Sequence, residues 1–267
     1  MGVQAQEAAK YRITYDCEAE YITGSPKTYR WAVDIGQSSA VFYNANHRGY
    51  VRERKELMDK GNTQALVEQL PALGKKYPAR VDLQIVWGAP EPGKYTFCKL
   101  VRDTKLRYEE TLPTVEWQMT DSLKTICEYE CQQAVGTLYG RTWTVWFTPE
   151  LPLSYGPYLL GGLPGMILAA RDAEGTFSFT AVGVEEAPGD AKVGLLDVDD
   201  AQKCSRKRYL EMRVELDGLS QKQILERALA AEGISSADGK VKFLDANGKA
   251  VEISDKPHPK KNYLDLE

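Results

Sequence analysis

The sequence predicts an α+β protein of mostly antiparallel β-structure, in which a curved meander sheet carries helical insertions packed on one side. Apolar and polar residues alternate with a period of two in many short segments. The connections between these segments are too short for helical crossovers, so the strands are expected to be antiparallel. Two other segments, 48–73 and 205–232, are dense in helix-forming residues. A chain of 267 residues can bury one core, which favours one domain.

The first half of the chain supplies most of the expected strands. They are the alternating segments 11–22, 27–35, 39–43, 81–87, 95–101 and 105–110. A turn at Gly24-Ser25-Pro26 joins the first two. Within the helical insertion, Gly61 is expected to end the first helix and Asn62 to cap the second.

The region 126–180 is the part around which the chain is organised. Its strand 142–148 places Trp143, Val145 and Phe147 on one face, expected in the core, with Thr142 and Thr144 facing away. The loop 149–165 that follows is rich in proline and glycine but also in leucine and tyrosine. A flexible linker is polar, so we expect an ordered loop that depends on positive φ at Gly162 or Gly165. A hairpin over 166–180, turning at 172–175, closes the region.

The C-terminal part is expected to turn helical after an exposed acidic connection over 185–200. Ser220 and Gln223 form a capping box, and Gly233 is the expected stop. A late hairpin is expected over 241–253. The expected division is a flexible N-terminus over 1–10, one domain over 11–255 and a tail over 256–267.

A motif series in this region resembles the GLPGLI family, a group of secreted or periplasmic proteins known mainly from Bacteroidota. It comprises Cys131, Gly140-Arg141, Trp143 with Trp146-Phe147-Thr148, Leu151-Pro152, Gly156-Pro157 and Gly162-Leu163-Pro164-Gly165-Met166-Ile167. Met166 stands where the family name has leucine, a volume-conserving exchange. The opening strand 11–15 and the closing segment 262–266 also fit. The resemblance implies a structural role for these positions and brings no activity with it.

Charge and hydropathy bear on three questions: nucleic-acid binding, membrane spanning and export. A net charge of −4 gives no general reason to expect nucleic acid as a partner. No run approaches the roughly 18 apolar residues of a membrane-spanning helix. Val3-Gln4-Ala5-Gln6 resembles the residues around a signal-peptidase site, which favours export to the periplasm or the medium.

The five cysteines predict no metal centre, because their spacing matches no zinc-site pattern. If Cys127 and Cys131 lie on one continuous strand, they are roughly 13 Å apart. A disulfide requires Cα atoms within about 7 Å, so we predict that these two are not bonded to each other. No cofactor is expected.

Candidate catalytic groups are few. His47 and His258 are the only histidines, and neither lies in a hydrolase motif. Arg141, expected across a hairpin from Cys131, would lower the pKa of that thiol if it came close. Glu128 and Glu130 are expected on one strand face, as a solvated pair rather than a glycosidase pair.

Binding is therefore the preferred hypothesis. A curved sheet under helices offers a concave apolar site, and Trp146, Tyr155 and Tyr158 are the candidate ligand rim beside the 149–165 loop. The alternative is that these side chains only cover one end of the sheet. We predict an exported, non-enzymatic binding or accessory protein, with a small molecule, a peptide or a cell-envelope protein as partner. The competing hypothesis is an enzyme that uses Cys131 or a carboxylate in a cleft of the sheet.

Overall fold

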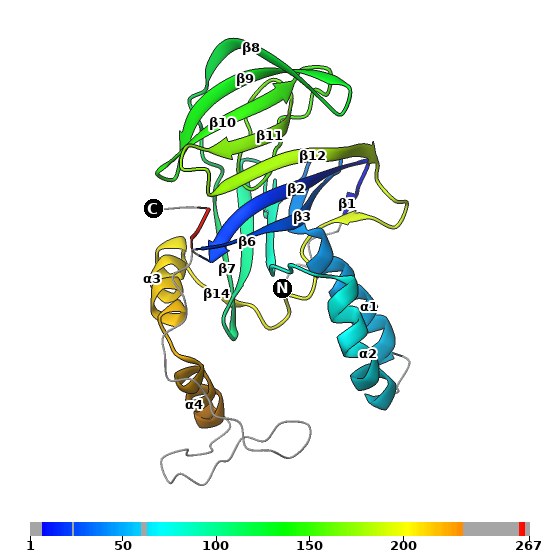
Figure 1. Ribbon diagram of the computed structural model, residues 1–267, viewed down its shortest axis with the longest axis vertical. Coiled ribbons are helices and arrows are strands. Elements are labelled where there is room, and N and C mark those ends of the chain that lie inside the picture. Colours follow the sequence, from blue (N-terminus) through cyan, green and yellow to red (C-terminus); the bar gives the residue numbers. More distant parts are fainter. Residues whose placement is uncertain (1–6, 23, 60–62, 232–261, 265–267) are drawn as a thin grey trace.

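Twelve strands form one open sheet, in a computed structural model that describes residues 7–22, 24–59, 63–231 and 262–264 (Figure 1). The order across the sheet is β14-β7-β6-β5-β4-β3-β2-β12-β11-β10-β9-β8. The strands are β2 (Tyr11–Ile22), β3 (Ser25–Ile35), β4 (Ala40–Asn44), β5 (Leu83–Trp87), β6 (Lys94–Val101), β7 (Thr104–Thr111), β8 (Gln118–Ile126), β9 (Tyr129–Leu138), β10 (Arg141–Thr148), β11 (Met166–Asp172), β12 (Phe177–Glu186) and β14 (Gln202–Lys203). A second, two-stranded sheet pairs β1 (Glu7–Ala8) with β13 (Lys192–Val193).

Two antiparallel meanders meet at the centre of the large sheet. Strands β2 to β7 run outward in chain order, and β8 to β12 run back until β12 pairs with β2. The short β14 is the exception, since it pairs with β7 in parallel. In Figure 1, β6 and β7 run steeply across the direction of β2 and β12, so the sheet is strongly twisted and curved. The predicted fold class is confirmed.

The helices form two pairs, α1 (Ala45–Asp59) with α2 (Thr63–Lys76) and α3 (Arg206–Asp217) followed by α4 (Gln221–Ala231). The fold class is as predicted, but the helices lie on both faces of the sheet and not on one side. Ala45 at the start of α1 packs on the face that carries Val41 and Tyr43. Tyr209 of α3 packs on Phe97, whose side chain belongs to the opposite, inner face. Alternation within each strand gives both faces apolar residues, so both can bind a helix.

The inner face of the sheet holds the main core. Trp31 stacks on Phe42 with ring centroids 4.6 Å apart, and Phe42 and Trp143 both contact Phe179. Aromatic side chains from both meanders therefore fill the concavity. This corrects the expectation of a concave apolar site, because the side chains that would line it pack against one another.

The predicted facing of strand β10 is confirmed. Trp143 and Val145 are fully buried and Phe147 is 2% exposed, while Thr142 is exposed. Thr148 is buried as well, next to a register shift against β11 between Trp146 and Phe147. Such a bulge breaks the period of two.

The β8–β9 connection differs from the prediction. Cys127 and Glu128 have φ of 49° and 70° and form the turn between the two strands. The cysteines at 127 and 131 therefore do not share one continuous strand, and Glu128 and Glu130 do not share one strand face. All five cysteines are free thiols, but the reason for expecting no Cys127–Cys131 bond, one continuous strand, is wrong.

The expected domain limits are too narrow. Residues Glu7–Ala8 form β1, inside the segment expected to be flexible. Leu264, in the expected tail, is 5% exposed and belongs to the main core, and Asn262 donates its backbone N–H to Tyr21 O at 2.9 Å.

Several helix signals can be compared with the structure. Ser205 caps α3, and Ser220 and Gln223 exchange the two hydrogen bonds of a capping box at 2.8 and 3.2 Å. Gly61, Asn62, Gly233, the hairpin over 241–253 and His258 lie outside the described residues. No helix in the described part of the chain is long and apolar enough to cross a membrane.

Candidate functional site

The three residues of the predicted aromatic rim do not form one exposed surface. Tyr158 is 1% exposed and belongs to the main core, where it adopts a φ of 57°. Tyr155 is half-buried against the ring of Trp87, at 5.6 Å, and Trp146 is half-buried with Lys124 5.2 Å from its ring. The prediction of Tyr158 as a rim residue is therefore wrong, because its buried side chain offers a ligand no surface.

The loop over 149–165 is ordered and built on close backbone approach. Gly162 has a φ of +83°, as predicted for one of the two glycines. Gly165 needs glycine for another reason, since a Cβ atom there would overlap the backbone of Thr148. Gly156 is similar, with Leu160 O only 2.8 Å from a Cβ atom. Pro157 and Leu163 are buried, and Pro164 is exposed.

Gly140 and Arg141 organise the far end of the β9–β10 hairpin. Gly140 has a φ of +76° in the turn. Arg141 is buried, with Nη1 2.5 Å from Asp172 Oδ2 and 3.0 Å from Glu174 Oε2, and its Nε donates to Tyr263 O at 2.9 Å. The guanidinium thus joins the sheet to the segment 262–264.

Cys131 lacks the features of a catalytic thiol. It is fully buried, and burial raises the pKa of its thiol to about 11. Arg141 pairs with Leu138, at the opposite end of β9, and is engaged by Asp172. Arg141 therefore does not approach Cys131, so the condition under which it would lower the pKa of that thiol is not met. Glu128 and Glu130 are exposed, as expected of a solvated pair.

A groove beside helix α1 is a candidate binding site. It has a volume of about 530 Å³ and lies on the outer face of the sheet, with Arg12 and Asp34 as its floor. One wall is α1, and the other is the segment 188–196. We call it the α1 groove. Its charged lining residues are Arg12, Asp34, Arg48, Arg52, Lys55, Glu56, Asp59, Asp190 and Lys192.

The floor is a cross-strand ion pair. Arg12 on β2 lies directly opposite Asp34 on β3. Arg12 Nε donates to Asp34 Oδ1 at 2.6 Å and Nη2 donates to Oδ2 at 2.8 Å, a bidentate geometry. Tyr43 donates its hydroxyl to Oδ2 at 2.9 Å. The hydrogen bonds to Asp34 raise the pKa of Arg12 further, so this guanidinium stays charged.

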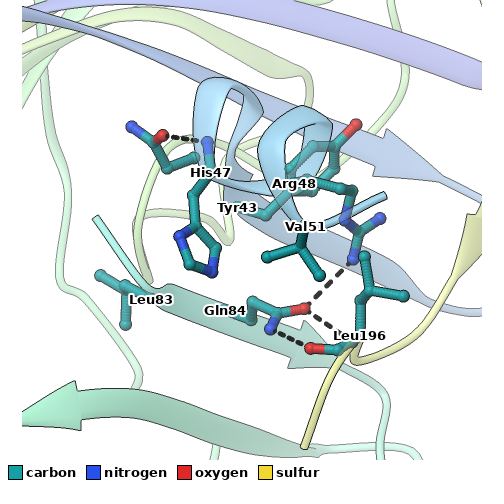
Figure 2. Close-up of a pocket in the computed structure, with 8 residues that line it drawn as sticks. Tyr43, His47, Arg48, Val51, Leu83, Gln84 and Leu196 are labelled. Carbon is teal, nitrogen blue, oxygen red and sulfur yellow. Dashed lines mark hydrogen bonds between the residues drawn. The ribbon is translucent and has the colours of Figure 1, made fainter. Parts of the chain in front are cut away.

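Arg48 is the second cation at the floor, and Figure 2, a close-up of the adjoining pocket, shows its side chain extending toward Gln84 and Leu196. Its guanidinium lies 3.8 Å from the centre of the Tyr43 ring. Nη2 donates to Gln84 Oε1 at 3.3 Å and to Gly194 O at 2.8 Å. Nη1 is 4.0 Å from Asp34 Oδ2, beyond hydrogen-bond distance. Burial lowers the pKa of Arg48, and the charge of Arg12 acts in the same direction.

Gln84 fixes the second wall of the groove. Its Nε2 donates to Leu196 O at 2.7 Å and its Oε1 accepts from Leu196 N at 2.8 Å, as the dashed lines in Figure 2 show. A buried strand side chain thus holds a segment that lies 112 residues further along the chain. At the mouth, Arg52 Nη1 lies 3.7 Å from Asp190 Oδ2 across the groove, and both side chains are mostly exposed. Such an exposed ion pair contributes little to stability, and its two side chains can separate.

A second charged cluster adjoins the groove behind α1. His47 Nε2 lies 3.4 Å from Asp82 Oδ1, and Lys105 Nζ lies 3.4 Å from Asp82 Oδ2 and 3.5 Å from Asp197 Oδ2. Burial lowers the pKa of His47, against the opposite effect of Asp82. The histidine is thus a half-buried group in a charge network. The described residues contain no group of three or more ligands that could hold a metal ion.

Part of this site had a sequence signal. Arg48, Arg52 and Lys55 follow the i, i+4, i+7 spacing that places side chains on one helix face. Asp34 stands in the apolar end of its strand, residues 31–35, where a buried charge requires a partner. The second wall had no such signal, because its position depends on a long-range contact with Gln84.

Comparison with known proteins gives a fold but no family. No family model matches the sequence, and no curated protein sequence matches it. Two crystal forms of PNGF-II, in space groups P21 and C2, superpose with a TM-score of 0.51 at 15% identity. They cover 79% and 80% of this chain and 34% of the PNGF-II chain. The fold resembles part of PNGF-II. The chain spans about a third of PNGF-II, and at this identity the likeness concerns the fold alone.

A third solved structure is more distant. The LolA superfamily protein NE2245 from Nitrosomonas europaea gives a TM-score of 0.27 at 9% identity, over 74% of this chain and 91% of that protein. A score this low carries no argument about the site.

Proposed function

We propose that this protein is a non-enzymatic binding or accessory protein whose ligand occupies the α1 groove. The observation that carries the proposal is the construction of the groove floor, where Arg12 and Arg48 are held by hydrogen bonds and remain partly accessible beside the buried Asp34. The volume of about 530 Å³ falls within the usual range of small-ligand sites. A small molecule or a short peptide is the partner that a groove of this size fits.

Two findings weigh against the enzymatic alternative. Cys131 is buried with a raised thiol pKa, so the thiolate that nucleophilic catalysis needs is scarce near neutral pH. Asp34, the buried carboxylate of the groove, already accepts hydrogen bonds from Arg12 and Tyr43. A general base needs a free lone pair beside its substrate. We therefore assign the groove to binding.

We further propose that the protein is exported and related to the GLPGLI family. The roles of its motif residues support this proposal. Gly162 has positive φ, Gly165 meets the backbone of Thr148, and Arg141 is the hub of a buried ion pair. These backbone and ion-pair requirements are structural, so they explain why the motif residues are needed for the fold rather than for a reaction. Fractionation of the native cells, followed by detection of the protein with an antibody, tests export.

The test of binding is a thermal-shift screen of a broad metabolite and peptide collection. It compares the native protein with Ala191→Trp, in which an indole would fill the groove that Ala191 lines. Ala173→Trp is the matched control, because Ala173 is exposed in the β11–β12 turn. Compounds that stabilise the native protein and Ala173→Trp, but not Ala191→Trp, support the proposal. Hits that bind all three proteins equally contradict it.

A further inference from the structure

We propose that the α1 groove takes a ligand by a single carboxylate, which enters first and lies between Arg12 and Arg48, and that the ligand is a short peptide held by its C-terminus. The inference rests on the proposed binding function and specifies the ligand class. It follows from the balance of charge at the floor, from the face that α1 presents, and from the acidic groups nearer the mouth.

The floor carries two guanidiniums and one carboxylate. Asp34 gives both oxygens to Arg12, whereas its closer oxygen is 4.0 Å from Arg48 Nη1. The charge of Arg48 thus has only this more distant contact with Asp34 as its ion pair at the floor, in a partly buried place where water screens it poorly. One carboxylate oxygen pair between the two arginines would neutralise that charge. A phosphate dianion would leave the floor with an excess of negative charge.

Helix α1 adds to the positive potential at the same end. It begins at Ala45, three residues before Arg48, and Asn44 Oδ1 caps it by accepting from His47 N at 2.8 Å. The partial positive charge of a helix N-terminus therefore lies near the floor. Arg52 and Lys55 continue the basic face outward from Arg48.

The outer part of the groove carries charges of both signs, since carboxylates line it beside Arg52, Lys55 and Lys192. Glu56 and Asp59 on α1 and Asp190 on the facing segment also line the groove, and all three are exposed. The carboxylates among these charges can attract an ammonium group. A short peptide with a free C-terminus and a free N-terminus matches this order of charges.

The test uses trialanine, trialaninamide and inorganic phosphate as probes, with binding measured by titration calorimetry. Trialanine is expected to bind the native protein, and trialaninamide, which lacks the carboxylate, about tenfold more weakly or not at all. Arg48→Met is expected to lose trialanine binding to the same degree. Arg208→Met, an exposed arginine on α3 paired with Glu211, is the matched control and keeps it.

Each outcome has a distinct meaning. Equal binding of trialanine and trialaninamide, or binding unchanged in Arg48→Met, overturns the carboxylate assignment. Phosphate binding that depends on Arg48, without trialanine binding, also overturns the carboxylate assignment. In that case the groove is still a binding site, but for another ligand. Should Arg48→Met fail to fold, the comparison of acid and amide on the native protein decides alone. Failure of the binding function itself is separate, because it appears as indifference of every screening hit to Ala191→Trp.

Discussion

Arg12 and Asp34 face each other across β2 and β3 and share two hydrogen bonds, at 2.6 and 2.8 Å. This cross-strand pair uses both oxygens of the only acidic side chain at the groove floor among the described residues. Arg48 therefore finds its hydrogen-bond acceptors elsewhere, in Gln84 and Gly194. The positive charge of the groove is a consequence of register, since a strand position fixes which arginine holds the carboxylate.

Two glycines of the 149–165 loop are predicted to differ in their tolerance of alanine. Gly162→Ala places a side chain in open space at a φ of +83°, so only backbone strain of about 1 to 3 kcal/mol is expected. Gly165→Ala drives a Cβ atom into the backbone of Thr148, which cannot rotate away, so a larger loss is expected. Urea unfolding of the two variants measures this. Greater damage from Gly162→Ala would contradict the assigned roles.

The buried ion pair of Arg141 and Asp172 is predicted to matter for stability. Asp172→Ala should cost about 3 to 5 kcal/mol, because it leaves a buried guanidinium without its partner and the Phe177 N–H without its acceptor. Glu174→Ala is the control, since Glu174 touches the same guanidinium but is 53% exposed, and it should cost no more than about 1 kcal/mol. Similar losses in both variants would show that Asp172 is not the main partner.

Cys131 is predicted to react slowly with iodoacetamide in the folded protein. Its thiol is fully buried and its pKa is raised to about 11 by burial, whereas Cys127 and Cys204 are half-buried. Peptide mass spectrometry after a short exposure at pH 7.5 should find label at Cys127 and Cys204 first. In urea all five thiols should react alike. Preferential labelling of Cys131 would revive the enzymatic hypothesis.

His47 is predicted to make the protein sensitive to mild acid. Burial lowers its pKa in the folded state below the usual 6.5. The stability that neutral His47 contributes is therefore fully present above pH 6.5 and is lost as the pH falls through the lower, folded-state value. Urea unfolding at pH 7.5 and 5 should show a smaller loss in His47→Gln than in the native protein. Equal losses would mean that other groups set the acid sensitivity.

Local patterns carried the sequence prediction where one segment decides its own structure. The period of two in strand β10 placed Trp143 and Phe147 in the core correctly, and the spacing of Ser220 and Gln223 identified a capping box. The turn at Cys127 was not predicted, because neither Cys127 nor Glu128 is a residue that favours positive φ. Their conformation is imposed by the pairing of β8 with β9.

The candidate site was harder to predict for a related reason. Tyr158 looked like a rim residue beside prolines and glycines, but its backbone turns it into the main core. The α1 groove joins β2, β3, α1 and the segment 188–196, which meet only after the two meanders have paired. A sequence shows the basic face of α1 but not the wall that stands opposite it.

Hydrogen–deuterium exchange with and without trialanine tests most directly whether the α1 groove, and not the 149–165 loop, is the binding site. Slower exchange in Ala45–Asp59 and in 188–196, with no change in 149–165, is the predicted result. Slower exchange confined to 149–165 would contradict the account.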